Sequence, residues 1–272
     1  MSSDTNVYVY ATISLVIGRL VLAGAYHKFF AKIPCVFRLF SSDLPSSVRR
    51  KFHENLWYSL WHSFSFVVNA WILVNSTWFK PLIMNWDHQV LRHEYETHAF
   101  EPYSRMFYLV SLAFWTSCLF FLGIETVRKD FFQMLMHHIV TVTLIGMSFV
   151  FNFHRFGLVV LLLHDVVDIF LYIAKCCMYK KHRVGSDIFF AVFATFFLIA
   201  RLILLPIYCL IPGYIFSRQV PVAMFLAVLL TFLYCLHIFW WLMIWRLIVK
   251  TFNGSAVETD SRSEPELDAK DE

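Results

Sequence analysis

Charged residues are scarce in this sequence. Asp, Glu, Lys and Arg make up 15% of the 272 residues, whereas 59% are hydrophobic and 19% are aromatic. A soluble domain could not bury that much apolar surface, but a protein that crosses a membrane several times can expose it to lipid. The first residues, MSSDTN, also lack a basic segment ahead of the first apolar run. We therefore expect that run to be a retained span and not a cleaved signal peptide.

The cysteines lack a framework spacing, and no CxxC pair occurs among them. This excludes a disulfide scaffold or a cysteine zinc cluster as the basis of the fold. The net charge of +4 is not gathered into a basic face with exposed aromatic residues, which argues against nucleic acid as a partner. The six cysteines are Cys35, Cys118, Cys176, Cys177, Cys209 and Cys235.

Seven apolar runs are long enough to cross a bilayer as helices. We therefore predict an all-α polytopic membrane protein whose seven or so transmembrane helices enclose a central cavity. Arg19, Arg201 and Arg246 lie in or near these runs, where snorkelling or pairing inside the bundle explains them. The runs cover residues 7–26, 57–79, 105–124, 131–151, 156–176, 187–211 and 220–249.

Basic residues gather in the loops after the first, third and fifth runs, for example at Lys28, Lys129 and Lys180. The positive-inside rule then predicts a luminal or external N-terminus and a cytosolic C-terminus. An odd number of spans agrees with this, because it requires the two ends to lie on opposite sides. Residues 253–272 are acidic and have no apolar periodicity, so we predict a transmembrane domain at 1–252 and a disordered cytosolic tail at 253–272.

Ionisable residues cluster in two neighbouring spans. The fourth contains His137 and His138, and the fifth contains His164, Asp165 and Asp168. A carboxylate near a bilayer centre costs roughly 2.5–3.5 kcal/mol, so these groups should face protein or water. A very short turn joins the two spans, and both sets lie about 20 Å from it, at 1.5 Å per residue. We expect the histidines and aspartates to meet at one depth near the cytosolic mouth, as a functional cluster and not only as a clamp between helices.

The absence of known metal-binding histidine motifs narrows the kinds of reaction that this cluster could catalyse. The HxxxH and HxxHH boxes of di-iron lipid hydroxylases do not occur, and neither does an HExxH zinc motif. Acid–base or nucleophilic catalysis by an imidazole that a carboxylate orients requires the fewest assumptions.

The block from Arg128 to Lys175 resembles the signature region of the ceramide synthases, the catalytic branch of the TLC-domain membrane proteins. The segments 235–247, CLHIFWWLMIWRL, and 260–264, DSRSE, resemble the last span of that family and the acidic motif after it. Phe149 departs from the tyrosine that the family often has, and the first loop is too short for a homeodomain-like insert. The matching elements are RKDF at 128–131, His137, His138, Ser148, Asn152, Arg155, Gly157, His164, Asp165, Asp168 and AK at 174–175.

The resemblance implies transfer of a fatty acyl group from acyl-CoA to the amine of a sphingoid base. The product would be (dihydro)ceramide, made in the endoplasmic reticulum membrane without a bound cofactor or metal. It also implies contact with membrane lipids and a homodimer or heterodimer. We expect His137, His138, Asp165 and Asp168 to be catalytic. We expect the substrates to contact Arg128, Lys129, Ser148, Asn152, His164 and Lys175.

Two mechanisms fit these residues. An Asp-oriented histidine can remove the proton of the amine, or an imidazole can first accept the acyl group itself. We favour the second, with His137 as acyl carrier, Asp168 orienting it, and His138 and Asp165 assisting proton transfer; the two histidines can exchange roles. The alternatives are a non-catalytic TLC-type lipid sensor or transport protein and a seven-span zinc amide hydrolase of the alkaline ceramidase kind.

Overall fold

The computed structural model describes residues 44–91, 102–123, 129–218 and 220–252, together with Asp4, Val9 and Thr12. Within these residues the chain forms helices and turns and no strand, which confirms the prediction of an all-α protein. Five helices are long and apolar enough to cross a membrane. They are Tyr103–Phe121, Phe131–Val150, His154–Tyr179, Arg183–Ser217 and Pro221–Thr251.

These five helices match five of the seven predicted spans, so the count of seven is not confirmed. The predicted span 7–26 lies outside the described residues. The predicted span 57–79 overlaps helix α3, Ser46–Asn75, which is not among the five. The division at residue 252 also falls where the description ends.

The helices follow one another with short connections. The element bounds are α3 Ser46–Asn75, α4 Phe79–Asn85, the 3-10 turn η1 His88–Leu91, α6 Pro102–Phe121, α7 Phe131–Val150, α8 His154–Tyr179, α9 Arg183–Phe196, the π-helical η2 Phe197–Leu204 and η3 Pro206–Leu210, α10 Ile211–Ser217 and α11 Pro221–Phe252.

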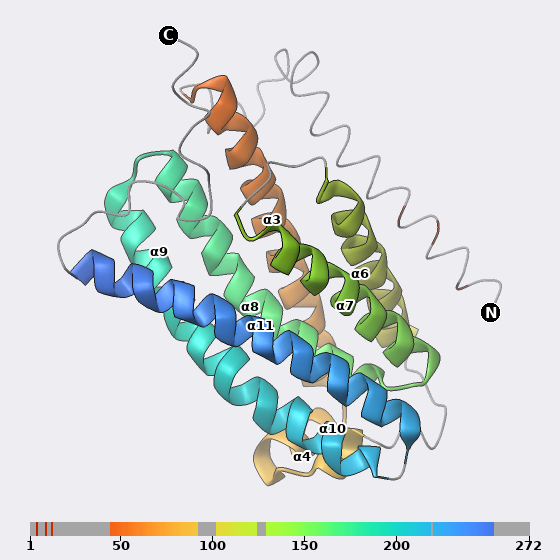
Figure 1. The fold of residues 1–272 in the computed structure, drawn as a ribbon. Coiled ribbons are helices and arrows are strands. Elements are labelled where there is room, and N and C mark those ends of the chain that lie inside the picture. Colours follow the sequence, from red (N-terminus) through yellow and green to blue (C-terminus); the bar gives the residue numbers. More distant parts are fainter. Residues whose placement is uncertain are drawn as a thin grey trace.

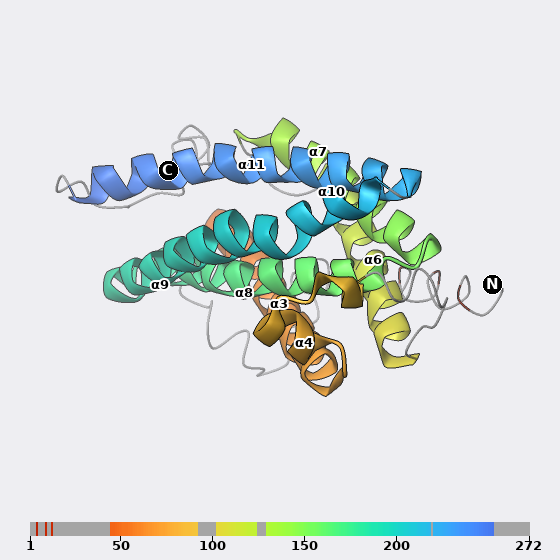
Figure 2. The ribbon, with the colours of Figure 1, turned by 90° about the horizontal axis from the view of Figure 1, so that it is seen from below.

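Helix α8 is central to the bundle (Figure 1). It packs against α3 along its most extensive interface and against α9, while α7 packs against α6 and α11. Figure 2 shows α11 along one side of the bundle, with α9 and α8 beneath it and α4 on the side away from α11. α8 therefore has different neighbours on its different faces, and each can meet a different set of its side chains.

The turn between α7 and α8 explains their antiparallel arrangement. Asn152 has a positive φ of 58°, a conformation that asparagine tolerates better than most residues. The backbone N–H of Phe153 donates to the carbonyl of Ser148 at 2.7 Å, which closes the end of α7 in the Schellman pattern. The chain reverses within three residues, as predicted.

Helix α3 is amphipathic, but its polar face is buried and its apolar face is exposed, the opposite of a helix in a soluble protein. Its buried face, against α8, carries polar side chains, and its exposed face carries large apolar ones at alternating spacings of four and three. This is the pattern of a helix that contacts lipid on one side and a polar interior on the other. The buried residues are Asn55, Ser59, His62, Ser65 and Asn69, and the exposed ones are Leu60, Phe64, Val67, Trp71 and Val74.

The rod from Arg183 to Ser217 changes its helical geometry in the middle, where η2 and η3 are π-helical. Pro206 has no N–H to donate to the carbonyl four residues earlier, that of Leu202. The hydroxyl of Tyr234 on α11 donates to this carbonyl at 3.2 Å. π-helical turns are rare and often occur at functional sites, and this one carries Arg201.

Candidate active site

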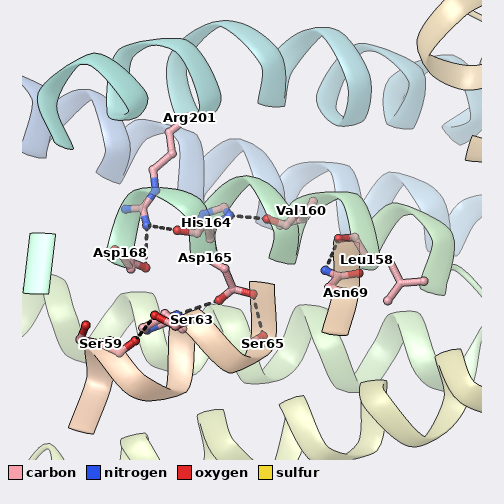
Figure 3. A network of polar contacts seen from close by, with 11 residues as sticks. Ser59, Ser63, Ser65, Asn69, Leu158, Val160, His164, Asp165, Asp168 and Arg201 are labelled. Carbon is pink, nitrogen blue, oxygen red and sulfur yellow. Dashed lines mark hydrogen bonds and ion pairs between the residues drawn. The ribbon is translucent and has the colours of Figure 1, made fainter. Parts of the chain in front are cut away.

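Helix α8 directs its ionisable side chains toward three different neighbours. His164, Asp165 and Asp168 are all buried, yet they contact α11, α3 and η2 respectively. Figure 3 shows Arg201 reaching Asp168 and the backbone of His164 on one side, while Asp165 points to Ser65 on the other.

Asp165 is held by two side chains of α3. The Nδ1 of His62 lies 2.7 Å from one carboxylate oxygen, and the hydroxyl of Ser65 donates to the other at 2.6 Å. The ring of His62 stacks on that of Tyr172, with centroids 5.6 Å apart and planes at 12°. Both oxygens of Asp165 are therefore engaged, and α3 and α8 are joined by a buried polar contact.

Asp168 forms a buried ion pair with Arg201. The guanidinium nitrogen Nη2 lies 2.7 Å from Oδ2 of Asp168 and donates to the carbonyl of His164 at 3.2 Å. The guanidinium carbon lies 5.1 Å from the centroid of Phe197. Either charge alone would be costly inside the bundle, so the pair stabilises the contact of α8 with η2 only while both partners are present.

His164 has both ring nitrogens engaged. Its Nδ1 lies 2.7 Å from the carbonyl of Val160, which can only accept, so Nδ1 carries the proton. In the neutral ring the other nitrogen, Nε2, is then an acceptor, and it lies 3.1 Å from Nε2 of His237 on α11. His237 is completely buried and must donate this hydrogen bond when both rings are neutral.

His137 lies in an aromatic setting. Its ring centroid is 5.7 Å from that of Trp115, 5.4 Å from that of Trp240 and 5.5 Å from that of His138. The Nδ1 of His137 is buried and has no hydrogen-bond partner among the described residues. His138 packs edge-on against the same Trp115, with centroids 5.6 Å apart. The two histidines thus flank one tryptophan.

A large apolar cavity begins at His137 and His164. The space between its walls that no protein atom fills is about 820 Å³, and this volume includes space open to the outside. From the histidines it extends along α7 and α8 toward their connecting turn and is closed on the far side by α10 and α11. His137 faces this cavity and His138 does not. The lining includes Tyr108, Trp115, Thr141, Leu144, Ser148, Phe156, Val160, Phe216, Ala223, Ala227 and Leu230.

The expected meeting of carboxylates and histidines is therefore corrected. Asp165 and Asp168 do not line the cavity; their partners are on α3 and η2. In particular, Asp168 pairs with Arg201 and does not orient His137. Three residues along a helix separate two side chains by about 60° around its axis, which is enough for them to meet different neighbours.

The residues expected to bind substrate lie in several places. Ser148 lines the cavity, and its hydroxyl lies 2.5 Å from that of Tyr108. Asn152 is in the turn beyond the other end of the cavity. Lys129 is exposed just before α7, and Lys175 is buried near the end of α8. Arg128 lies outside the described residues.

Sequence reasoning missed His62, Ser65 and His237 and left Arg201 unassigned within the bundle. The signal for the first two was the polar spacing along α3, which is visible at 59, 62, 65 and 69. His237 stands alone in an apolar run, and nothing in its neighbourhood along the chain indicates its contact with α8. In the described ranges, no group of three or more His, Cys, Asp or Glu side chains is arranged to hold a metal ion.

The fold and its buried polar centre define a polytopic all-α membrane protein with an apolar pocket beside that centre. Residues 51–246 match the protein family described as the TLC domain. This chain belongs to the TLC domain family. The likeness to the ceramide synthases that its central block indicated is confirmed.

Three curated proteins illustrate the similarity. The chain is 32% identical over 248 residues to ceramide synthase 5 of Homo sapiens, and the aligned region covers 89% of this chain and 61% of that protein. It is 32% identical over 242 residues to ceramide synthase 4 of Bos taurus, covering 87% and 60%. It is 31% identical over 249 residues to ASC1-like protein 3 of Oryza sativa subsp. japonica, covering 84% and 83%. The chain thus spans about 60% of the length of the two animal ceramide synthases.

Proposed function

We propose that this chain is a ceramide synthase, which transfers a fatty acyl group from acyl-CoA to the amine of a sphingoid base and gives (dihydro)ceramide and CoA. The observation that carries the proposal is a long apolar cavity that has His137 at its polar end. The similarity to proteins named ceramide synthase supports the choice of substrates.

The cavity suits an extended hydrocarbon chain. Its walls are almost entirely apolar, and between His137 and the turn at residue 151 it follows about 20 Å of helix, at 1.5 Å per residue. Burial of each methylene group contributes about 0.8 kcal/mol, so a long acyl chain would bind there with its tail toward the turn. The thioester carbonyl would then lie beside His137.

In the first step, a ring nitrogen of His137 attacks the thioester carbon and the C–S bond breaks. The thiolate of CoA leaves with the electron pair, and the acyl group stays on the imidazole. In the second step, the neutral amine attacks the same carbon, the C–N bond to the imidazole breaks with its electron pair on the ring nitrogen, and the amine nitrogen gives up a proton that balances the CoA thiolate released in the first step. His137 is then returned in its neutral form. This order requires only one long-chain substrate in the cavity at a time.

His137 is better suited than its neighbours to carry the acyl group. Both nitrogens of His164 are engaged by Val160 and His237, and His138 does not line the cavity. Trp115 and Trp240 restrict the ring of His137 on two sides. A restricted ring holds its nitrogen in one position relative to the bound carbonyl, which favours attack.

The same end of the bundle carries basic residues. Lys129 precedes α7, and Lys180 and Lys181 follow α8. These helix ends lie together, because the turn that joins α7 to α8 is at the opposite end of both helices. His137 lies about 9 Å along α7 from its first residue, at 1.5 Å per residue. Lysines at this end would attract the phosphates of CoA. With the positive-inside rule, this supports a cytosolic face here, a luminal N-terminus and a cytosolic C-terminus. Residence in the endoplasmic reticulum is implied by the resemblance to the ceramide synthases and is part of the proposal.

The test uses the purified full chain and acyl-CoA alone, without a sphingoid base. We expect release of CoA in one burst and a mass increase of one acyl group on the peptide that contains His137. His137→Ala should abolish both, whereas His138→Ala should slow the reaction but leave the acyl-peptide detectable. An unmodified peptide from protein that makes ceramide would contradict the acyl carrier. Binding of lipid without any ceramide formation would favour a non-catalytic sensor or transport protein.

A further inference from the structure

Thr141 differs from the other described helical threonines whose bonds are seen. The hydroxyls of Thr116, Thr143, Thr195, Thr231 and Thr251 each donate to the carbonyl four residues earlier, at 2.8–2.9 Å. This is the usual arrangement for threonine inside a helix, especially in a membrane. The hydroxyl of Thr141 is buried and makes no hydrogen bond to the described part of the chain.

The hydroxyl of Thr141 is also placed at the cavity. Thr141 lines it, as His137 does, and the two residues are four apart on α7, so they lie on one face with Cβ atoms about 5–6 Å apart. The other aliphatic hydroxyl of the lining, Ser148, is engaged by Tyr108 and by the carbonyl of Ile145. A buried donor without a partner is costly, and a catalytic role is one of the reasons for which such a group is kept in a native structure.

We propose that Thr141 is a catalytic residue that donates a hydrogen bond to the carbonyl oxygen of the bound acyl group. When His137 attacks the thioester, that oxygen becomes an oxyanion, and when the amine attacks the acyl-imidazole it becomes one again. The same hydroxyl serves both steps, because the oxygen belongs to the same acyl group throughout. No bond to Thr141 forms or breaks. This inference rests on the proposed function.

The distance along the helix supports this role. Thr141 lies four residues after His137, which is about 6 Å along α7 at 1.5 Å per residue. The oxygen of an acyl group bonded to the ring of His137 would lie between these two side chains. A donor aimed at the place where charge develops stabilises the transition state more than the ground state. Thr141 should therefore affect kcat and the rate of acyl-enzyme formation, with little effect on the KM for acyl-CoA.

The experiment compares three variants of the full chain in detergent, with acyl-CoA and sphinganine as substrates. Thr141→Val keeps the shape and removes the hydroxyl, and Thr141→Ser keeps the hydroxyl. Thr143→Val is the matched control, because Thr143 is on the same helix and its hydroxyl donates to the carbonyl of Ile139 in that helix. We expect Thr141→Val to lower kcat by about 100-fold or more, as loss of one oxyanion donor does elsewhere. Thr141→Ser should stay at least about tenfold above it.

Thermal unfolding separates this role from a structural one. Replacing a buried hydroxyl that lacks a partner by a methyl group should leave the midpoint unchanged or raise it. A fall in kcat without a fall in stability therefore supports the proposal. With an active wild type, any of three results would overturn the proposal. These are an unchanged kcat in Thr141→Val, an equal fall of kcat in Thr143→Val, and a Thr141→Ser variant as slow as Thr141→Val. A wild-type protein that neither releases CoA nor forms amide contradicts the proposed function and this inference with it.

Discussion

The hydroxyl of Tyr108 occupies the space in which a side chain at position 157 would begin. A Cβ atom on Gly157 would lie 1.7 Å from this oxygen and 2.6 Å from the ring carbon that bears it. Tyr108 is completely buried, and its hydroxyl also contacts Ser148. Glycine at 157 thus allows α6 to reach α8 beside the cavity and leaves the tyrosine in contact with α7.

Gly157→Ala should destabilise the protein. The new methyl group would force Tyr108 away from Ser148, and overpacking of this kind costs about 1–3 kcal/mol. Gly146→Ala is the control, because nothing lies within 4 Å of a Cβ at that position. It should be neutral or stabilise by up to about 1 kcal/mol, since alanine favours helix. The free energies of unfolding in detergent check both changes, and equal effects would contradict the close approach.

Loss of Arg201 should be far more damaging than loss of an exposed arginine. Arg201→Leu leaves Asp168 as an unpaired buried charge, for which we expect a loss of about 3–5 kcal/mol in unfolding free energy. Removing the carboxylate as well, in Arg201→Leu/Asp168→Leu, should restore much of it. Arg50→Ala, on an arginine paired with Glu54 at the surface, should change stability by less than about 1 kcal/mol. No recovery in the double variant would argue against the pair.

Two serines on α3 provide a comparison for the Asp165 contact. Ser65 donates to Asp165, whereas Ser63 donates to the carbonyl of Ser59 in its own helix. Because hydrogen bonds to charged groups contribute about 1.5–3 kcal/mol, Ser65→Ala should lower the unfolding free energy by that amount. Ser63→Ala should have little effect. A thermal unfolding series of the two variants measures the difference, and indistinguishable midpoints would show that Ser65 does not hold the carboxylate.

The far end of the cavity should limit the length of the acyl chain. Ala227 is buried at the lining, and the side chain of Val228, the next residue on α11, is half exposed. Ala227→Phe should fill part of the cavity and lower the rate with long-chain acyl-CoA more than with shorter ones. Val228→Phe should leave the ratio of the two rates as in wild type. A ratio that is the same in all three proteins would mean that the chain binds elsewhere.

Five of the predicted spans and the α7–α8 turn could be predicted from the sequence because they depend on local properties. Apolar length gives the helices, and Asn152 can adopt a positive φ at the end of α7. The depth of His137 followed from counting along the helix. Its position at one end of a cavity did not follow, because the cavity depends on how α10 and α11 close over α7 and α8.

The partners of Asp165 and Asp168 depend on packing that no local pattern records. The two residues are close in sequence, yet one meets α3 and the other meets η2. Polar residues on α3 hold Asp165. The same residues lower the average hydropathy of α3, so the apolar pattern of the sequence did not indicate this role. Pro206 is the local sign that the helical geometry changes near Arg201, but the contact of Tyr234 on α11 with the carbonyl of Leu202 has no such sign.

The π-helical geometry of the rod around Arg201 also has a consequence for insertions and deletions. Each residue rotates an α-helix by about 100°, so removing one residue between 202 and 204 would turn everything beyond it relative to Arg201. Arg201 and the cavity wall at Cys209 and Gly213 would then no longer face the same side of the bundle. Exposed positions such as Leu198 and Ile203 can accept other apolar side chains. The number of residues in this stretch is under tighter constraint than their identity.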